Sequence, residues 1–292
     1  MNKGYIKIAL ILLSLAGYMQ NVAFAAEYAP DVSSEANPDR QKTIFEKYRD
    51  FVCYDIYEIL AAIDHANDTS ELLLKLSETS ADNYSTFYKE NESKIIYFKR
   101  IGNMDISRVH LTIPYASNVS NTKQYLRYKN NFKLNNHYYI YPYFYFSLVL
   151  CRDIVRIYSK YLIMFDKLNI DSNYSNIIKK YVLAAKVKPS NDTTVILCPS
   201  RALNYLGDIY NEPNMKEILK NTQSIETGID PEEALTKLGT NIAGFVVKKR
   251  NDNVQVTYIN VIYDGGNSIE YACDKRERNY ACSSILSLEQ RI

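Results

Sequence analysis

The 292-residue sequence contains no tryptophan, few glycines (9), prolines (8) and cysteines (5), and only three histidines. The histidines, His65, His110 and His137, are far apart, so none has a partner at metal-ligand spacing. The motifs H-E-x-x-H, G-x-S-x-G, G-x-G-x-x-G and the P-loop are all missing. The sequence therefore gives no catalytic residue, and we expect no metal and no cofactor.

The chain also lacks an excess of charge beyond its first 25 residues. It has 35 basic and 33 acidic residues in total. The first 25 residues contain Lys3 and Lys7 and no acid, so 33 residues of each sign remain. A neutral chain gives no compositional argument for a nucleic-acid partner.

Long hydrophobic runs are confined to the N-terminus. Lys3 and Lys7 precede the apolar segment Ile8–Met19, and small residues stand at Ala23 and Ala25. This arrangement predicts a signal peptide over residues 1–25 that is cleaved after Ala25. We therefore expect a periplasmic or secreted protein with no transmembrane helix after cleavage, beginning with a flexible leader over residues 26–39.

What the chain has in abundance is tyrosine, 27 residues, and the most aromatic segment is residues 137–168. Apolar residues recur there at steps of three and four, which predicts a central helix. The uncharged run Tyr138–Leu150 is too short for a membrane span, which needs roughly 20 residues. Its tyrosines either fill a core or form an exposed surface for a protein or glycan partner. The candidate binding residues are Tyr138, Tyr139, Tyr141 and Tyr143.

The overall pattern predicts an α+β fold in two parts. Residues 40–187 read as a mainly helical domain, with helices at 44–63, 71–76, 82–99 and 175–186 besides the central one and a short β-like run at 107–113. Residues 188–292 read as a mixed domain with a strand at 193–198 and short helices at 201–210, after 212 and after 230. This domain ends in an antiparallel meander with strands at 244–250, 254–263, 268–274 and 280–286. The second of these strands changes phase at Tyr258–Ile259, which indicates a bulge or burial on both faces.

The last predicted hairpin places Cys273 opposite Cys282. Directly opposed strand residues can reach disulfide distance, and an oxidising compartment favours the bond. We therefore predict a Cys273–Cys282 disulfide; the alternative is two buried thiols. Cys53 and Cys151 form a weaker candidate pair.

Cys198 ends a predicted strand just before a predicted helix, where a helix N-terminus would lower the pKa of a thiol. No C-x-x-C motif accompanies it, and a buried structural cysteine is the commoner explanation.

Two functional hypotheses follow. The first is an exported, non-enzymatic protein-interaction or envelope-associated protein. The alternative is a periplasmic hydrolase or transferase whose site assembles from distant residues, around Cys198, His110 or the helix-start acids Glu232 and Glu233. A cavity that joins Cys198 or a carboxylate pair to a histidine, with a perturbed pKa among them, would favour the enzyme.

Overall fold

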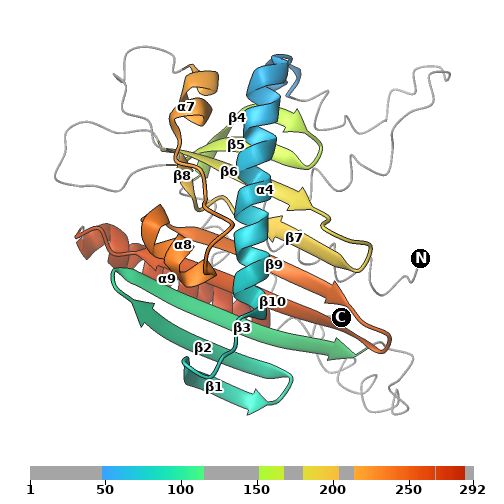
Figure 1. The fold of residues 1–292 in the computed structure, drawn as a ribbon, viewed down its shortest axis with the longest axis vertical. Coiled ribbons are helices and arrows are strands. Elements are labelled where there is room, and N and C mark those ends of the chain that lie inside the picture. Colours follow the sequence, from blue (N-terminus) through green and yellow to red (C-terminus); the bar gives the residue numbers. More distant parts are fainter. Residues whose placement is uncertain (1–47, 115–150, 168–179, 204–213, 267, 287–292) are drawn as a thin grey trace, which may run out of the picture.

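The computed structural model describes residues 48–114, 151–167, 180–203, 214–266 and 268–286, which form an α+β fold, as predicted (Figure 1). Its centre is one ten-stranded sheet whose paired strands are all antiparallel. The strands are β1 (Ser85–Asn91), β2 (Lys94–Ile101), β3 (Met104–Pro114), β4 (Cys151–Ser159), β5 (Leu162–Lys167), β6 (Lys180–Val187), β7 (Thr193–Leu197), β8 (Ala202–Leu203), β9 (Ile242–Lys249) and β10 (Asn253–Tyr263). The helices are the 3-10 turn η1 (Arg49–Phe51), α4 (Ile56–Glu78), α7 (Met215–Asn221), α8 (Pro231–Leu238) and α9 (Ser268–Leu286).

The sheet joins the two predicted domains. Its strand order is β1-β2-β3-β10-β9-β7-β6-β5-β4, and β8 adds to β6. The predicted boundary after residue 187 falls between β6 and β7, which are hydrogen-bonded neighbours. Strands from both sides of that boundary therefore share one hydrogen-bonded layer.

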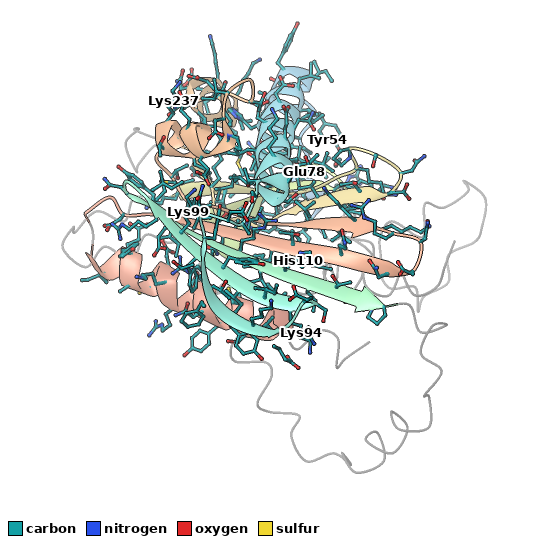
Figure 2. The ribbon with its side chains drawn as sticks, turned by 60° about the horizontal axis from the view of Figure 1, so that its bottom comes forward. Tyr54, Glu78, Lys94, Lys99, His110 and Lys237 are labelled. Atoms are coloured by element: carbon teal, nitrogen blue, oxygen red, sulfur yellow. The ribbon has the colours of Figure 1, made fainter. Side chains whose placement is uncertain are left out.

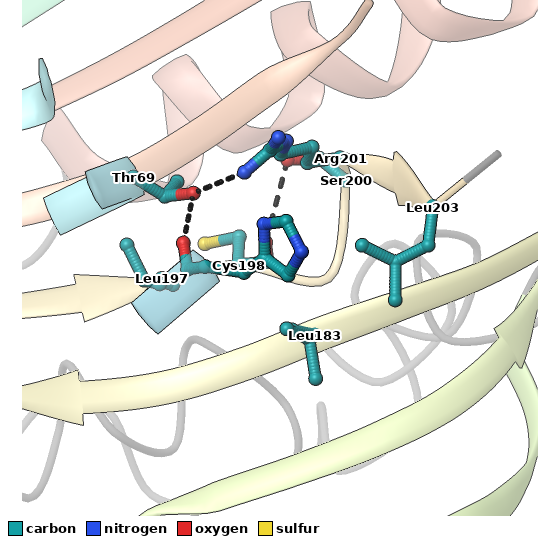
Figure 3. A pocket seen from close by; sticks show the side chains of 8 residues that line it. Thr69, Leu183, Leu197, Cys198, Ser200, Arg201 and Leu203 are labelled. Atoms are coloured by element: carbon teal, nitrogen blue, oxygen red, sulfur yellow. Dashed lines mark hydrogen bonds between the residues drawn. The ribbon is translucent and has the colours of Figure 1, made fainter. Parts of the chain in front are cut away.

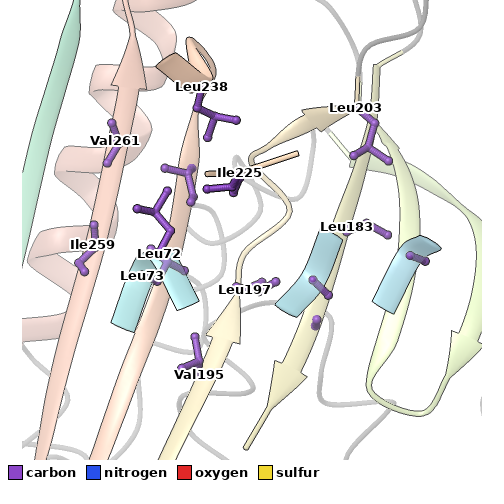
Figure 4. Close-up of a cluster of buried hydrophobic side chains, with 14 of the residues drawn as sticks. Leu72, Leu73, Leu183, Val195, Leu197, Leu203, Ile225, Leu238, Ile259 and Val261 are labelled. Atoms are coloured by element: carbon purple, nitrogen blue, oxygen red, sulfur yellow. The ribbon is translucent and has the colours of Figure 1, made fainter. Parts of the chain in front are cut away.

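Helix α4 crosses one face of this sheet, and α7 and α8 pack on the same side (Figure 1). The carboxylate of Asp55 accepts hydrogen bonds from the backbone N–H groups of Tyr57 and Glu58, so it caps the start of α4. The buried residues of α4 include Leu72, Leu73 and Leu76, which form a core with the strands beneath them (Figure 4). This apolar stripe holds α4 on the sheet.

Gly244, in the middle of β9, sets how closely α4 approaches. A Cβ atom at this position would lie 2.5 Å from Leu73 Cδ1 and 2.6 Å from the carbonyl oxygen of Ile196. Side-chain and backbone atoms therefore occupy the space that any larger residue needs. Only glycine lets α4 rest directly on the sheet here.

Helix α9 covers the opposite face, against β3 and β10. Ser107 on β3 is 3.4 Å from the Cys282 sulfur of α9, whereas its neighbour Ile106 belongs to the core on the α4 side. Tyr258 and Ile259 of β10 divide in the same way between the two cores, and the register of β10 runs without a break. The phase change in the sequence thus reflects burial on both faces and not a bulge.

The prediction that residues 40–187 are mainly helical is wrong for most of the described part. Residues 82–99 contain β1 and the start of β2, residues 151–167 form the hairpin of β4 and β5, and residues 180–187 form β6. For β4 and β6 the helix predictions failed because these strands are buried on both faces, whereas β1 is exposed along its whole length. Ile157 and Tyr158 are consecutive and both buried, in different cores. A strand buried on both faces loses the alternation that distinguishes it from a helix.

The predicted meander is correct only for β9 and β10. Residues 268–286 form the single helix α9 instead of two further strands. Its most buried residues are Asp274, Arg278, Cys282 and Ile285, which recur at steps of four and three. Because two of the four are charged, hydropathy could not reveal this helical stripe.

The predicted Cys273–Cys282 disulfide is wrong for the same reason. Both thiols are free. Nine residues of α-helix separate their Cα atoms by about 13 Å, at about 1.5 Å per residue, and a disulfide requires less than about 7 Å.

We predict that Gly244→Ala lowers the free energy of unfolding by about 1–3 kcal/mol, because the new methyl group must displace Leu73 or the Ile196 backbone. Urea unfolding measures the change. Gly228→Ala is the matched control, since nothing lies within 4 Å of a Cβ there. Equal stability of the two variants would contradict the close approach of α4.

We also predict that iodoacetamide modifies Cys273 in protein that has not been reduced, because this thiol is free and partly exposed to solvent. Cys282 should react much more slowly, since it is 3% exposed and burial raises the pKa of its thiol. Trypsin cuts between the two cysteines, so peptide mass mapping reads each separately. A linked peptide pair in the unreduced digest would show that the disulfide exists after all.

Candidate ligand-binding site

The sequence-predicted binding residues Tyr138, Tyr139, Tyr141 and Tyr143 lie outside the described residues. The described residues instead contain two adjacent cavities near the ends of β7, β8 and β10. We call them the outer cavity, of about 290 Å³, and the inner cavity, of about 10 Å³. Ser200 lines both of them.

The outer cavity is partly open and lies between the β6–β8 pair, the turn from α8 to β9, and the first turns of α9. Its volume is at the lower end of the range for small-molecule sites, roughly 300–1,000 Å³. Its polar lining includes Lys180, Ser200, Asn241, Glu270, Tyr271 and Asp274.

Asn241 joins the turn from α8 to β9 to the end of β10 and to α9. Its Oδ1 accepts a hydrogen bond of 2.8 Å from the backbone N–H of Tyr263, at the end of β10. Its Nδ2 donates a hydrogen bond of 2.6 Å to the carboxylate of Asp274 on α9. The turn that carries Asn241 starts at Gly239, which ends α8 with a positive φ of 56°. The position of this amide is thus fixed by neighbours on both sides.

The two carboxylates of the outer cavity are both engaged. Glu270 and Asp274 are four residues apart on α9, so they lie on one face of the helix. Glu270 forms an ion pair with Lys180 of β6 at 2.6 Å. Asp274 is buried and accepts the hydrogen bond from Asn241. The cavity therefore offers oriented polar groups, and the charge of Glu270 is paired with that of Lys180.

Behind the outer cavity, Asp105 fastens α9 to β3. It accepts a hydrogen bond of 3.0 Å from the Tyr271 hydroxyl and pairs with Arg278 at 3.3 Å. Burial alone would raise the pKa of Asp105, but the Arg278 charge and these hydrogen bonds hold it below its usual value. This network sets where Tyr271 and Asp274 stand in the cavity wall.

The inner cavity is formed where α4 meets the chain that follows β7 (Figure 3). His65 and Thr69 come from α4, and Cys198, Ser200 and Arg201 come from the segment between β7 and β8. Arg201 Nη1 donates a hydrogen bond of 3.0 Å to Thr69 Oγ1, and Nη2 donates to the carbonyl oxygen of Gln223. Burial lowers the pKa of Arg201 to about 10, so the guanidinium keeps its charge at neutral pH.

Cys198 and His65 do share a cavity, which is the arrangement that would favour an enzyme. The charge state is the opposite of what a nucleophile requires, however. Burial raises the pKa of the Cys198 thiol to about 12, so it stays protonated at neutral pH. A cavity of about 10 Å³ has room for about one water molecule, not for a substrate.

The other candidates of the enzyme hypothesis lie elsewhere. His110 is on β3 and lines neither cavity (Figure 2). Glu232 forms an ion pair with Lys99 at 2.7 Å, and Glu233 with Lys237 at 3.1 Å. Within the described residues, no group of three or more His, Cys, Asp and Glu side chains is arranged to hold a metal ion.

Sequence reasoning singled out Cys198 and missed His65, Asn241 and Asp274. Only His65 and Thr69 could have been found from a pattern in the sequence. They interrupt the apolar stripe of α4 between Ala62 and Leu73. A polar residue on a buried stripe must find a polar partner, and such a residue is a candidate for a site.

The start of α4 presents a second feature, an exposed apolar surface of Phe51, Tyr54, Ile56, Tyr57 and Leu60. Tyr54 is 81% exposed (Figure 2) and Tyr57 is 68% exposed. Lys216 of α7 lies over the Tyr57 ring at 4.7 Å.

No helix in the described part of the chain is long and apolar enough to cross a membrane.

Comparisons with known proteins found no matching family model and no matching curated protein. Three of the solved structures that match are the human StarD13 (DLC2) lipid transfer and protein localization domain, a STAR-related lipid transfer protein from Xanthomonas axonopodis, and human StAR-related lipid transfer protein 5. Their sequence identities are 7%, 10% and 6%, and their TM-scores are 0.34, 0.33 and 0.38. The matches cover 77%, 70% and 79% of this chain and 96%, 98% and 96% of those chains. These identities and TM-scores are too low to assign a family or a ligand.

We predict that the protein loses stability as the pH falls from 7.5 to 5.5, and that His65→Gln reduces this loss. Burial, with a smaller effect of Arg201, lowers the pKa of His65 below 6.5. The unfolded chain therefore binds a proton near pH 6.5 that the folded protein does not bind. The free energy of unfolding consequently decreases as the pH decreases in this window. Urea unfolding at several pH values measures the slope.

His110 also has a pKa lowered by burial, so His110→Gln should flatten the curve too, and the double variant most of all. Parallel stability curves for the wild type and His65→Gln would show that His65 is not buried in its neutral form.

Proposed function

We propose that this protein is an exported, non-enzymatic binding protein whose outer cavity takes a small, neutral, polyhydroxylated molecule such as a monosaccharide. One observation carries the proposal. A cavity of about 290 Å³ is lined by polar side chains that neighbouring groups hold in fixed orientations.

The mixed lining supports a ligand without a strong charge of its own. Lys180 and Glu270 neutralise each other, and the remaining carboxylate, Asp274, already accepts a hydrogen bond from the uncharged amide of Asn241. Hydroxyl groups can both donate and accept hydrogen bonds, so they suit a wall that contains carboxylates, an amide, an ammonium and hydroxyls together. The rings of Tyr263 and Tyr271 add apolar area at the same cavity.

The state of the candidate catalytic groups supports binding without chemistry. The Cys198 thiol is protonated at neutral pH, so it is not a nucleophile in this state. Export is part of the proposal because residues 1–25 have the pattern of a signal peptide.

An apolar lipid is a poorer fit to the described residues. The space between α4 and the sheet is filled by the core, down to the contact of Leu73 with Gly244. A protein partner is the second candidate, and the exposed apolar surface at the start of α4 is the observation in its favour. The cavity is the first candidate because hydrogen bonds and an ion pair hold several of its polar lining groups in place.

We predict that the purified protein binds at least one of D-glucose, D-galactose, D-mannose and N-acetyl-D-glucosamine, and that Thr240→Trp weakens this binding roughly tenfold or more by filling the outer cavity. Two-dimensional ¹H–¹⁵N NMR titration measures both affinity and location. The matched control is Thr236→Trp on the exposed side of α8, which should bind like the wild type.

The proposal fails if none of the four sugars perturbs the residues of the outer cavity. It also fails if Thr240→Trp and Thr236→Trp bind equally well. Phosphatidylcholine vesicles are titrated in parallel, and binding to them without sugar binding would replace the proposed ligand with a lipid.

A further inference from the structure

The inner cavity presents a hydrogen-bond acceptor on His65. The His65 Nε2 atom lies 2.7 Å from the carbonyl oxygen of Leu219. A carbonyl oxygen only accepts hydrogen bonds, so Nε2 carries the proton. In the neutral imidazole Nδ1 is then an acceptor, and in the structure Nδ1 is buried without a partner. His65 is 7% exposed, so this acceptor cannot turn to bulk water.

Arg201 supplies a donor to the same cavity. Its two terminal nitrogens are bonded to Thr69 and Gln223, whereas its Nε–H is buried without a partner. Arg201 is 5% exposed. His65 and Arg201 both line the inner cavity, so an unsatisfied acceptor and an unsatisfied donor belong to residues of one small volume.

The acceptor on His65 and the donor on Arg201 together determine which chemical group can bind between them. An anion could accept from Arg201 but would face the lone pair of His65, and an ammonium could donate to His65 but would face a guanidinium. A hydroxyl oxygen satisfies both, because it accepts one hydrogen bond and donates another. The volume of about 10 Å³ admits one such oxygen.

The inner cavity adjoins the outer one at Ser200, which lines both. We propose that the inner cavity receives one hydroxyl group of the molecule bound in the outer cavity, which donates to His65 Nδ1 and accepts from Arg201 Nε–H. This inference rests on the proposed function, and it narrows the ligand to molecules that carry a projecting hydroxyl.

The first test uses the wild-type protein and three probes of similar size. Methanol both donates and accepts, formate only accepts, and methylammonium only donates. We expect methanol to shift the ¹⁵N resonances of His65 Nδ1 and Arg201 Nε, and formate and methylammonium to leave them unchanged. Arg108 Nε is the internal control, because it is also buried without a partner but does not line the cavity.

Each other result overturns the inference. If methanol leaves both nitrogens unchanged, the inner cavity holds water only. If formate shifts them, the site takes an anion, and if methylammonium does, it takes a cation.

The second test uses the sugar that binds the outer cavity. His65→Gln keeps an N–H group for the Leu219 carbonyl but replaces the ring Nδ1 by an amide oxygen that is not held at the same position, so it should weaken binding roughly tenfold. His110→Gln is the matched control and should have no effect, since His110 lines neither cavity. On the wild type, one monodeoxy analogue of that sugar should bind roughly tenfold more weakly and fail to shift His65 Nδ1. This measurement does not depend on the folding of a variant.

The two proposals fail separately. Sugar binding that depends on Thr240 but is equal in the wild type and His65→Gln, with every monodeoxy analogue still shifting His65 Nδ1, overturns the inner-cavity inference alone. Absence of any Thr240-dependent sugar binding overturns the proposed function and its ligand. The methanol experiment then decides by itself whether the inner cavity accepts a hydroxyl.

Discussion

The contact between Leu73 of α4 and Gly244 of β9 fixes the rest of the described structure. His65, Thr69 and Leu73 follow one another at steps of four residues, so they lie on one face of α4. Because Leu73 packs directly on the sheet, His65 and Thr69 lie beside the C-terminal end of β7, where the chain leaves the sheet. The segment from Cys198 to Arg201 meets them there. The inner cavity is therefore a consequence of how closely a helix packs on a sheet that is apolar on both faces.

Helix α9 is attached to the opposite face in a different way. Its buried stripe contains Arg278, which pairs with Asp105 and lies over the ring of Phe98 at 4.8 Å. A buried ion pair adds little net stability, but it fixes the register of the two elements that it joins. One turn before Arg278, the same stripe places Asp274 against Asn241 in the outer cavity. The charges that hydropathy could not interpret are thus the ones that attach the helix and build the site.

The sequence was informative where one signal dominated. Strands at 107–113, 193–198 and 254–263 and the helix after Asp230 were predicted, and they correspond to β3, β7, β10 and α8, because their turns and caps are local. The hairpin of β4 and β5 was not, because burial on both faces removed the alternation at Ile157 and Tyr158. Of the site, only Cys198 was singled out. His65 and Arg201 line the same cavity although they are 136 positions apart in the sequence. No local sequence pattern indicates such a long-range arrangement.

The local structure after Cys198 determines whether its thiol is reactive. The argument for a reactive thiol required a helix N-terminus immediately after it, whose dipole would lower the thiol pKa. The chain instead forms the short strand β8 at Ala202–Leu203, paired with β6. No helix dipole opposes burial at this point, and burial raises the thiol pKa. The cation next to it, Arg201, is turned toward Thr69 and Gln223. A protonated thiol, a neutral imidazole and a guanidinium with one unused N–H form the wall of the inner cavity, and the thiol is not a nucleophile in this charge state.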